Sequence, residues 1–304
     1  MGLTEQNDLL LPGPWTHRDI TANGVRLHIA EAGSGPLVVL LPGFPEIWWA
    51  WRHQIPALAD AGYRVVAVDL RGTGSSDKPP RPYDPVTTAG DIAGLVRALG
   101  QSHAFLVGQD LGGMIAWTTA ALHPGIVDGL TVLGAAHPRR WRREIVRSQA
   151  QRHGSAHVFN SQLPRLPEAR LTRDDAAEVR RLMRSWSGPW RDTDDFRAAT
   201  AIYRSAMQVP QAAYGCAEYS RWQVRSLLRP DGYAFQQSMA RQLQCPVLQI
   251  HGDADTCVLP QTAHGSEAYV AGRYEWLLVE GCGHFPAEEH PELVTAALLN
   301  FLAS

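Results

Sequence analysis

The sequence predicts an α/β protein: a mostly parallel sheet covered by helices on both faces and interrupted by a helical insertion. Four short apolar runs typical of buried strands alternate with helix-like segments in the first half of the chain. These runs lie near residues 37–41, 64–68, 104–108 and 129–134. Strand patterns then disappear until residues 246–251 and 274–279. We therefore expect one sheet domain in two parts, residues 1–137 and 236–304, separated by a helical cap at residues 138–235.

Other elements follow from local signals. Two antiparallel strands are expected near residues 17–22 and 26–31, because Asn23-Gly24 between them is a strong hairpin turn signal. A final helix is expected at His290–Phe301. Helix-like spacing broken by prolines marks three cap segments. These are Asp174–Arg184, Asp194–Met207 and Tyr214–Leu228.

The turn after the third apolar run carries the residue that we expect to react. Residues 108–113 read Gly-Gln-Asp-Leu-Gly-Gly, between a strand and a helix-like stretch. This context is typical of a nucleophile elbow, where glycines let the chain bend around a strained residue. Esterases place serine there, whereas this chain has Asp110. A carboxylate that attacks carbon forms an alkyl ester, so the substrate needs an sp³ carbon with a leaving group, as in an epoxide or alkyl halide.

Two later segments supply the partners that this nucleophile needs. His284 follows a strand-like run and two glycines, and its late position fits the order nucleophile, acid, histidine. Asp253 and Asp255 both follow the strand near residues 246–251, where a carboxylate can orient and stabilise the imidazole. We favour Asp255, because one step past the turn places it nearer the histidine loop.

Together these motifs resemble the epoxide hydrolase and haloalkane dehalogenase branch of the α/β-hydrolases, and they are most similar to the epoxide hydrolases. The resemblance covers about residues 15–135 and 245–303, and it includes the run Gly43-Phe44-Pro45-Glu46. It implies the α/β-hydrolase fold with a helical cap domain.

The resemblance also implies a role for each motif. Asp110 would be the nucleophile, His284 the base that activates water, and Asp255 its acidic partner. The backbone N–H groups of Phe44 and Leu111 would form the oxyanion hole.

The sequence departs from the family where the leaving group is held. The residue after the nucleophile is commonly tryptophan, whose indole N–H can hold a halide, and Leu111 cannot do this. Epoxide hydrolases open the ring with two cap tyrosines that donate protons. By local pattern these positions fall at His157 and Ser220, and Tyr219 is one residue from the second. We expect Tyr219 and His157 as donors, with the alternative that both are ordinary cap residues.

Composition and charge argue against several classes of partner and cofactor. A formal net charge of -2 and the lack of a basic cluster with a nucleic-acid motif argue against nucleic acid. The four cysteines show no CxxC pair or metal-type spacing, so we expect free thiols, no metal and no cofactor. The sequence has no signal-peptide pattern and no apolar run of 18 residues, which predicts a soluble, cytoplasmic protein without a membrane partner. A homodimer is compatible with the sequence.

The expected reaction is hydrolysis of a small-molecule epoxide to a vicinal diol. A group of cap aromatics predicts an apolar pocket for a bulky substrate. These are Trp186, Trp190, Tyr203 and Tyr214. One alternative is a haloalkane-type dehalogenase that uses the same three catalytic residues. Another is a ligand-binding homologue without turnover, against which the intact water-activating pair argues.

Overall fold

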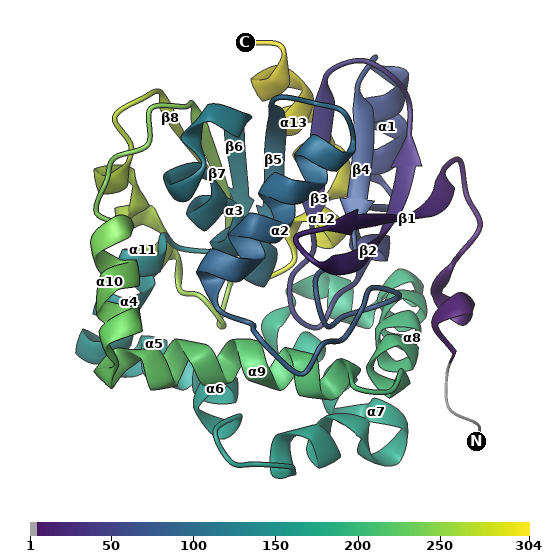
Figure 1. The fold of residues 1–304 in the computed structure, drawn as a ribbon. Helices are drawn as coiled ribbons and strands as arrows, with labels where there is room; N and C mark the ends of the chain where they lie inside the picture. The colour runs from purple at the N-terminus through teal and green to yellow at the C-terminus, as the bar shows by residue number, and fades with distance from the viewer. Residues whose placement is uncertain (1–4) are drawn as a thin grey trace.

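One eight-stranded sheet organises residues 5–304, the part of the chain that the computed structural model describes (Figure 1). The strand order is β1-β2-β4-β3-β5-β6-β7-β8, and only β2 runs antiparallel to its neighbours. The strands are β1 (Thr16–Ala22), β2 (Val25–Ala32), β3 (Leu37–Leu41), β4 (Arg64–Val68), β5 (Ala104–Gln109), β6 (Val127–Leu133), β7 (Val247–Gly252) and β8 (Tyr274–Val279). The predicted mostly parallel sheet is confirmed. Residues 1–4 of the expected first part, residues 1–137, lie outside the described residues.

The hairpin between β1 and β2 forms at the predicted turn. Ala22 pairs with Val25, which leaves Asn23 and Gly24 as a two-residue loop. Their φ angles of 47° and 78° are both positive, as the tight turn that matches strand twist requires. This hairpin places the antiparallel strands at one edge of the sheet.

Alternate residues of the strands face two separate layers of helices. In β3, Val39 packs in the cluster with α2 (Pro85–Ala98) and α3 (Asp110–Leu122). Its neighbour Val38 belongs to the cluster with α1 (Gln54–Asp60) and α13 (Pro291–Leu302). Both faces of β3 are therefore buried, which explains why this strand reads as a continuous apolar run.

All elements between β6 and β7 are helical (Figure 1). The longer ones are α4 (Pro138–Arg147), α5 (Gln149–Gly154), α6 (Ala156–Asn160), α7 (Leu166–Trp186), α8 (Asp194–Gln208), α9 (Ala212–Arg225) and α10 (Pro230–Ser238). α7 is broken at residues 173–176, where three consecutive residues have positive φ. The helix predicted from Asp174 therefore begins just after this break. We call residues 138–235 the cap.

Short helices complete the chain. They are η1 (Gln6–Leu9), η2 (Trp48–Trp51), η3 (Pro124–Ile126), η4 (Pro189–Asp192), η5 (Ser226–Leu228), α11 (Pro260–His264), η6 (Gly265–Tyr269) and α12 (Pro286–Glu289). In residues 5–304, no helix is both long and apolar enough to cross a membrane.

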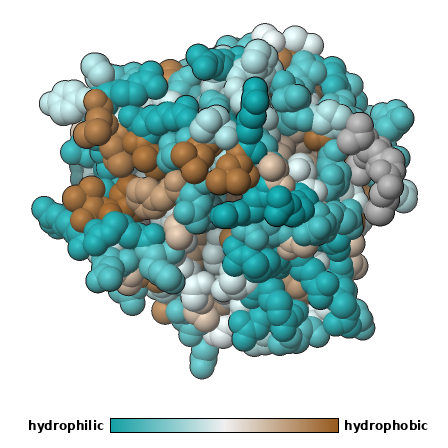
Figure 2. Space-filling model, turned by 90° about the horizontal axis from the view of Figure 1, so that it is seen from below, coloured by the Kyte–Doolittle hydropathy of each residue, from teal (hydrophilic) through white to brown (hydrophobic). Residues whose placement is uncertain are grey.

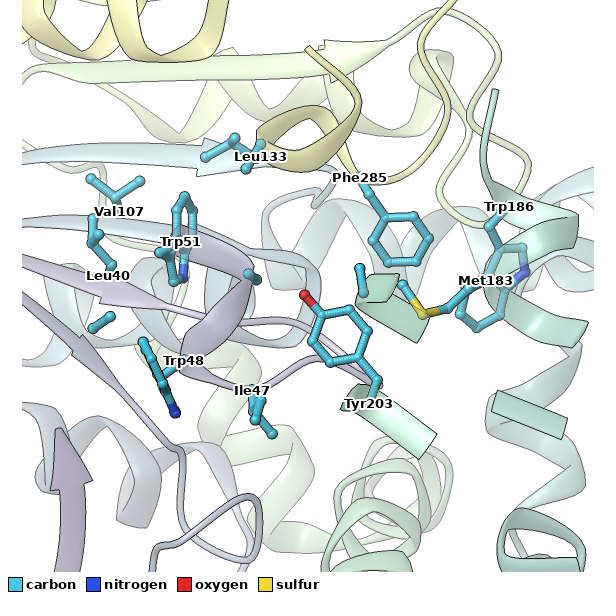
Figure 3. Packing of buried hydrophobic residues seen from close by; sticks show 14 of the residues in the cluster. Leu40, Ile47, Trp48, Trp51, Val107, Leu133, Met183, Trp186, Tyr203 and Phe285 are labelled. Atoms are coloured by element: carbon cyan, nitrogen blue, oxygen red, sulfur yellow. The ribbon is translucent and has the colours of Figure 1, made fainter. Parts of the chain in front are cut away.

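A continuous apolar cluster joins the cap to the sheet domain. Figure 3 shows Met183 and Trp186 of α7 and Tyr203 of α8 gathered around Phe285, which lies just before α12. Phe285 and Tyr203 are fully buried. The cap is therefore fixed over the sheet by hydrophobic packing, and the loop that carries His284 lies at this junction.

Candidate active site

The strained turn predicted at Asp110 joins the end of β5 to the start of α3. Asp110 has a φ of 46°, in the left-handed region that residues with side chains seldom adopt. The backbone is also crowded, since a Cβ on Gly112 would stand 2.3 Å from the carbonyl oxygen of Leu41. Only glycine fits there. This turn presents the Asp110 carboxylate, 17% exposed, to a cavity below the cap.

The structure brings the three predicted catalytic residues together. His284 Nδ1 lies 2.8 Å from Asp255 Oδ2, within hydrogen-bond distance. His284 Nε2 lies 3.5 Å from Asp110 Oδ1, close enough for electrostatic attraction. Asp255 and His284 are buried, whereas Asp253 is exposed. The geometry thus favours Asp255 over Asp253 as the partner of the histidine.

Asp255 is held by more than the catalytic histidine. Its Oδ1 accepts hydrogen bonds from the backbone N–H groups of Cys257 (2.8 Å) and Val258 (3.0 Å). A second imidazole, His251, places Nε2 3.2 Å from Asp255 Oδ2 and 2.8 Å from the carbonyl oxygen of Val258. A carbonyl only accepts, so His251 Nε2 carries the proton. Sequence reasoning missed His251, although its spacing of four from Asp255 at a strand end was a usable signal.

These contacts set the charges of the resting site. Burial alone would raise the pKa of both aspartates, but His284 and the hydrogen-bond donors hold the pKa of Asp110 and of Asp255 below the ordinary value. Burial would lower the pKa of His284, yet the neighbouring Asp255 and Asp110 raise it well above the ordinary value. These shifts favour an ionised Asp110, the form that a nucleophile needs, beside a protonated His284.

One of the two expected oxyanion donors already contacts the nucleophile. The Phe44 N–H donates to Asp110 Oδ2 at 3.0 Å. The loop that carries Phe44 is fixed by the buried Glu46, which accepts a hydrogen bond from the Gly43 N–H at 3.1 Å. Between residues 5 and 304, no hydrogen bond joins the Leu111 N–H to Asp110.

Two cavities lead to the nucleophile. An inner cavity of about 40 Å³ is lined by Asp110, and an outer cavity of about 470 Å³ extends through the cap. Four residues line both cavities: Phe44, His157, Cys216 and Ser220. A ligand in the outer cavity would therefore pass these side chains to reach the Asp110 carboxylate.

His157 lies where the two cavities meet. Its ring stacks on Phe44, with centroids 6.0 Å apart and planes 3° apart, and lies 4.7 Å from the Trp186 ring. Burial lowers the pKa of His157 to about 4, although Asp110 opposes this shift. Within the described residues its Nδ1 is buried and has no hydrogen-bond partner. A neutral imidazole with spare hydrogen-bonding capacity thus stands beside the nucleophile.

Tyr219 and Ser220 occupy different surroundings. The Tyr219 ring borders the inner cavity, but its hydroxyl donates to the carbonyl oxygen of Arg71 at 2.8 Å. Ser220 lines both cavities. The structure therefore turns the Tyr219 hydroxyl away from Asp110 and presents Ser220 at the position where the family pattern has tyrosine.

Of the four expected pocket aromatics, Trp186 lines the outer cavity. Its ring lies edge-on to His284, with centroids 5.6 Å apart. Trp190 packs against Phe285 and donates its indole N–H to Asp195 Oδ2 at 2.9 Å. Trp190 therefore serves the cap-to-core contact.

The two remaining aromatics also lie outside the cavities, which differs from the sequence expectation. Tyr203 is fully buried, and its hydroxyl donates to Glu288 Oε1. The Tyr214 hydroxyl donates to the carbonyl oxygen of Pro80 at 2.9 Å. Each phenol has a partner in the sheet domain, so both residues join the cap to the core.

The predicted free thiols are confirmed. They are Cys216, Cys245, Cys257 and Cys282. Burial raises the pKa of Cys216 to about 12 and that of Cys257 to about 11, so the two thiols that line the inner cavity are protonated at neutral pH. Nowhere in residues 5–304 do three or more His, Cys, Asp or Glu side chains form a group that could hold a metal ion.

Comparisons with known proteins place the chain in a family. A family model described as alpha/beta hydrolase fold matches residues 36–291. Epoxide hydrolase A of Mycobacterium tuberculosis is 32% identical, over 95% of this chain and 98% of its own length.

Solved structures give the same result for the fold. Epoxide hydrolase A from Mycobacterium thermoresistibile has a TM-score of 0.77 and 28% identity, over 95% of this chain and 98% of that one. A Bacillus megaterium epoxide hydrolase in complex with an inhibitor has a TM-score of 0.82 and 27% identity, over 94% of this chain and 100% of that one. The predicted fold class is confirmed.

Proposed function

We propose that this protein, a hydrolase that belongs to the α/β-hydrolase family and is related to epoxide hydrolases, opens epoxides to vicinal diols through a covalent Asp110 ester. One observation carries the proposal: the strained elbow holds an aspartate in place of serine, beside a paired histidine and acid. A carboxylate nucleophile forms an ester with an sp³ carbon. An epoxide carbon supplies that electrophile.

The first step uses the free oxygen of Asp110. Phe44 binds Oδ2, which leaves Oδ1 to attack a ring carbon. The carbon–oxygen bond of the ring breaks as the ester bond forms, and the negative charge moves to the former ring oxygen. That oxygen takes a proton from the solvent, which completes a hydroxyalkyl ester of Asp110 and is balanced by the proton released when the ester is hydrolysed.

Ring opening requires a donor near the leaving oxygen. We assign this role to His157, because it borders both cavities and is neutral, and a neutral imidazole N–H can polarise an oxygen by hydrogen bonding. The Ser220 hydroxyl, on α9, is the second candidate for this donor. Tyr219, expected as a donor from the sequence, has its hydroxyl engaged by Arg71.

Formation of the ester prepares the second step. Once Asp110 is esterified it loses its negative charge, so one of the groups that raise the pKa of His284 is gone. His284 can then release its proton and, oriented by Asp255, deprotonate a water molecule that attacks the ester carbonyl carbon. Asp110 Oδ2 becomes the oxyanion, and the Phe44 N–H is already 3.0 Å from it.

A trapping experiment tests this mechanism. If His284 acts in the second step, His284→Gln should react with an epoxide but should not release diol. Intact-protein mass spectrometry should show an adduct of one substrate mass, and peptide mapping should place it on Asp110. Rapid diol release by this variant, or an adduct on another residue, contradicts the assignment.

The same site could in principle displace a halide. Leu111 follows the nucleophile and has no N–H in its side chain to hold a halide, which favours the epoxide. Diol formation from an epoxide panel, measured beside halide release from haloalkanes, separates the two reactions. A binder without turnover would give neither product.

A further inference from the structure

Charge is divided unevenly between the cap and the rest of the chain. Residues 138–235 hold 18 of the 28 lysine and arginine residues but 10 of the 30 acidic residues. The cap therefore has a formal net charge of +8, and the remainder has -10. The near-neutral total therefore conceals a strongly cationic cap, which is about a third of the chain and lies on one side of the sheet domain (Figure 1).

The cap also exposes large apolar side chains. Val146 at the end of α4 is 67% exposed, and Leu228 at the end of η5 is 97% exposed. In the α6–α7 segment, Leu163 lies between the two helices and Leu166 is the first residue of α7, and they are 58% and 51% exposed. Single exposed apolar residues are common, so their significance depends on whether they share one face.

Hydrogen bonds join the segments of the cap that carry these residues. Arg225 donates to the carbonyl oxygen of Gln162 at 3.3 Å, which joins the end of α9 to the α6–α7 segment. Arg142 donates to the carbonyl oxygen of Leu227 at 2.9 Å, which joins η5 to α4. Figure 2, which views the molecule from the cap side, shows a hydrophobic band on the side where Figure 1 has α4, α5 and α10.

We define the cap-edge patch as these four apolar residues with the exposed arginines next to them in sequence. The apolar members are Val146, Leu163, Leu166 and Leu228, and the arginines are Arg147, Arg165 and Arg229. The patch adjoins the outer cavity, because Ser161 and Pro167 line that cavity on either side of the exposed leucines.

We propose that the cap-edge patch docks on a lipid surface rich in anionic headgroups, with the leucines of the α6–α7 segment inserted among the headgroups. Exposed apolar side chains beside arginines are the composition of a peripheral membrane contact, which combines burial in the interface with attraction to anionic lipid. The expectation of no membrane partner rested on the lack of a spanning segment, and a peripheral contact needs none.

Docking would place the mouth of the outer cavity at the membrane. This part of the inference rests on the proposed function: an apolar epoxide dissolved in the bilayer could enter the cavity without crossing bulk water. The charged side of the patch also orients the protein, because the acidic sheet domain is repelled from the same surface.

Vesicle flotation of the full chain tests the docking without reference to catalysis. We expect binding to vesicles of phosphatidylcholine with phosphatidylglycerol, weak binding to phosphatidylcholine alone, and a decrease with added salt. Each arginine near an anionic surface contributes about a fivefold factor, so Arg147→Gln with Arg165→Gln should weaken binding by about 25-fold. Leu163→Ser with Leu166→Ser should also weaken it while leaving the salt dependence unchanged.

The matched control lies on the sheet domain. Leu278 and Leu293 are 48% and 40% exposed, so Leu278→Ser with Leu293→Ser removes a similar apolar area elsewhere and should leave binding unchanged. Absence of vesicle binding, equal binding to neutral vesicles, or equal losses in control and patch variants overturns the proposal. Self-association without vesicle binding also overturns the proposal if the patch variants abolish it. The cationic cap of one copy would then pair with the acidic sheet domain of another.

Activity on a water-soluble epoxide separates the two proposals. The patch variants should keep the wild-type rate on such a substrate, because no patch residue touches Asp110. A protein that binds vesicles but hydrolyses no epoxide would refute the proposed function and leave the docking intact.

Discussion

The sheet domain and the cap contribute to the active site in different ways. On the sheet side, Asp110, His284 and Asp255 occupy three strand-end segments and are joined by short contacts, with Asp255 held by two backbone N–H groups and a second histidine. On the cap side, His157 has a ring nitrogen without a partner among residues 5–304, and the neighbouring Tyr219 points elsewhere. Backbone geometry at the strand ends fixes the residues on the sheet side, and packing of the cap helices positions the residues on the cap side.

This contrast predicts that the sheet side and the cap side affect the two reaction steps differently. The sheet side supplies the nucleophile and the water-activating pair, so its variants should block ester formation or ester hydrolysis completely. The cap side supplies hydrogen bonds to the leaving oxygen, so its variants should slow ester formation and spare ester hydrolysis. Variants of each half can test whether the separation holds.

The largest effect is expected at the nucleophile. Asp110→Asn keeps the size of the side chain but replaces the carboxylate with a poor nucleophile, so turnover should fall by at least about 10⁴-fold. Circular dichroism should show a folded protein, and epoxide consumption gives the rate.

Slow deamidation of the introduced amide could restore some activity with time. Asp110→Ala excludes this route and should stay inactive in the same assay. Wild-type rates from either variant would remove the ester mechanism altogether.

The second expected effect is a pH dependence that differs between the two steps. Asp110 has a lowered pKa, so ester formation should persist into mildly acidic solution. Ester hydrolysis needs neutral His284, whose pKa Asp255 still raises after Asp110 is esterified. Hydrolysis should therefore slow about tenfold for each pH unit below that pKa.

Rapid quenching followed by mass spectrometry measures this difference. The fraction of enzyme present as ester should increase as the pH falls and decrease as the pH rises. An ester that accumulates at high pH would show that His284 does not act as the base.

The third effect should be confined to the cap. His157→Phe keeps a ring that can stack on Phe44 but removes the hydrogen-bond donor, so ester formation should slow by about 10²-fold or more. Single-turnover measurements should show ester hydrolysis near the wild-type rate. If ester formation is also unchanged, another group donates the hydrogen bond to the leaving oxygen and Ser220→Ala is the next variant to measure.

The same contrast explains how much the sequence revealed. Asp110 and His284 follow strands in glycine-containing turns, and such short patterns determine where a side chain points. Tyr219 and Ser220 are adjacent on α9, where one step rotates the side chain by about 100° around the helix axis. The sequence located the segment, but it could not determine which of the two hydroxyl groups is available to the cavity.

Long-range partners account for the other differences. Tyr203 was expected in the substrate pocket because of its residue type and its place in the cap. Its hydroxyl instead meets Glu288, 85 residues later in the chain. A composition pattern carries no information about such a contact, whereas the alternation of apolar runs with helix-like segments was sufficient to predict the sheet.

The smallest expected effect is at Tyr219, and it distinguishes the sequence expectation from the structure. Tyr219→Phe removes the hydrogen bond to the carbonyl oxygen of Arg71, so the free energy of unfolding should fall by about 1 kcal/mol. Because that hydroxyl points away from Asp110, ester formation should keep its wild-type rate. Urea denaturation and single-turnover kinetics on the same preparation give both quantities. Slower ester formation without loss of stability would mean that the hydroxyl rotates into the cavity when substrate binds and would restore Tyr219 as a donor.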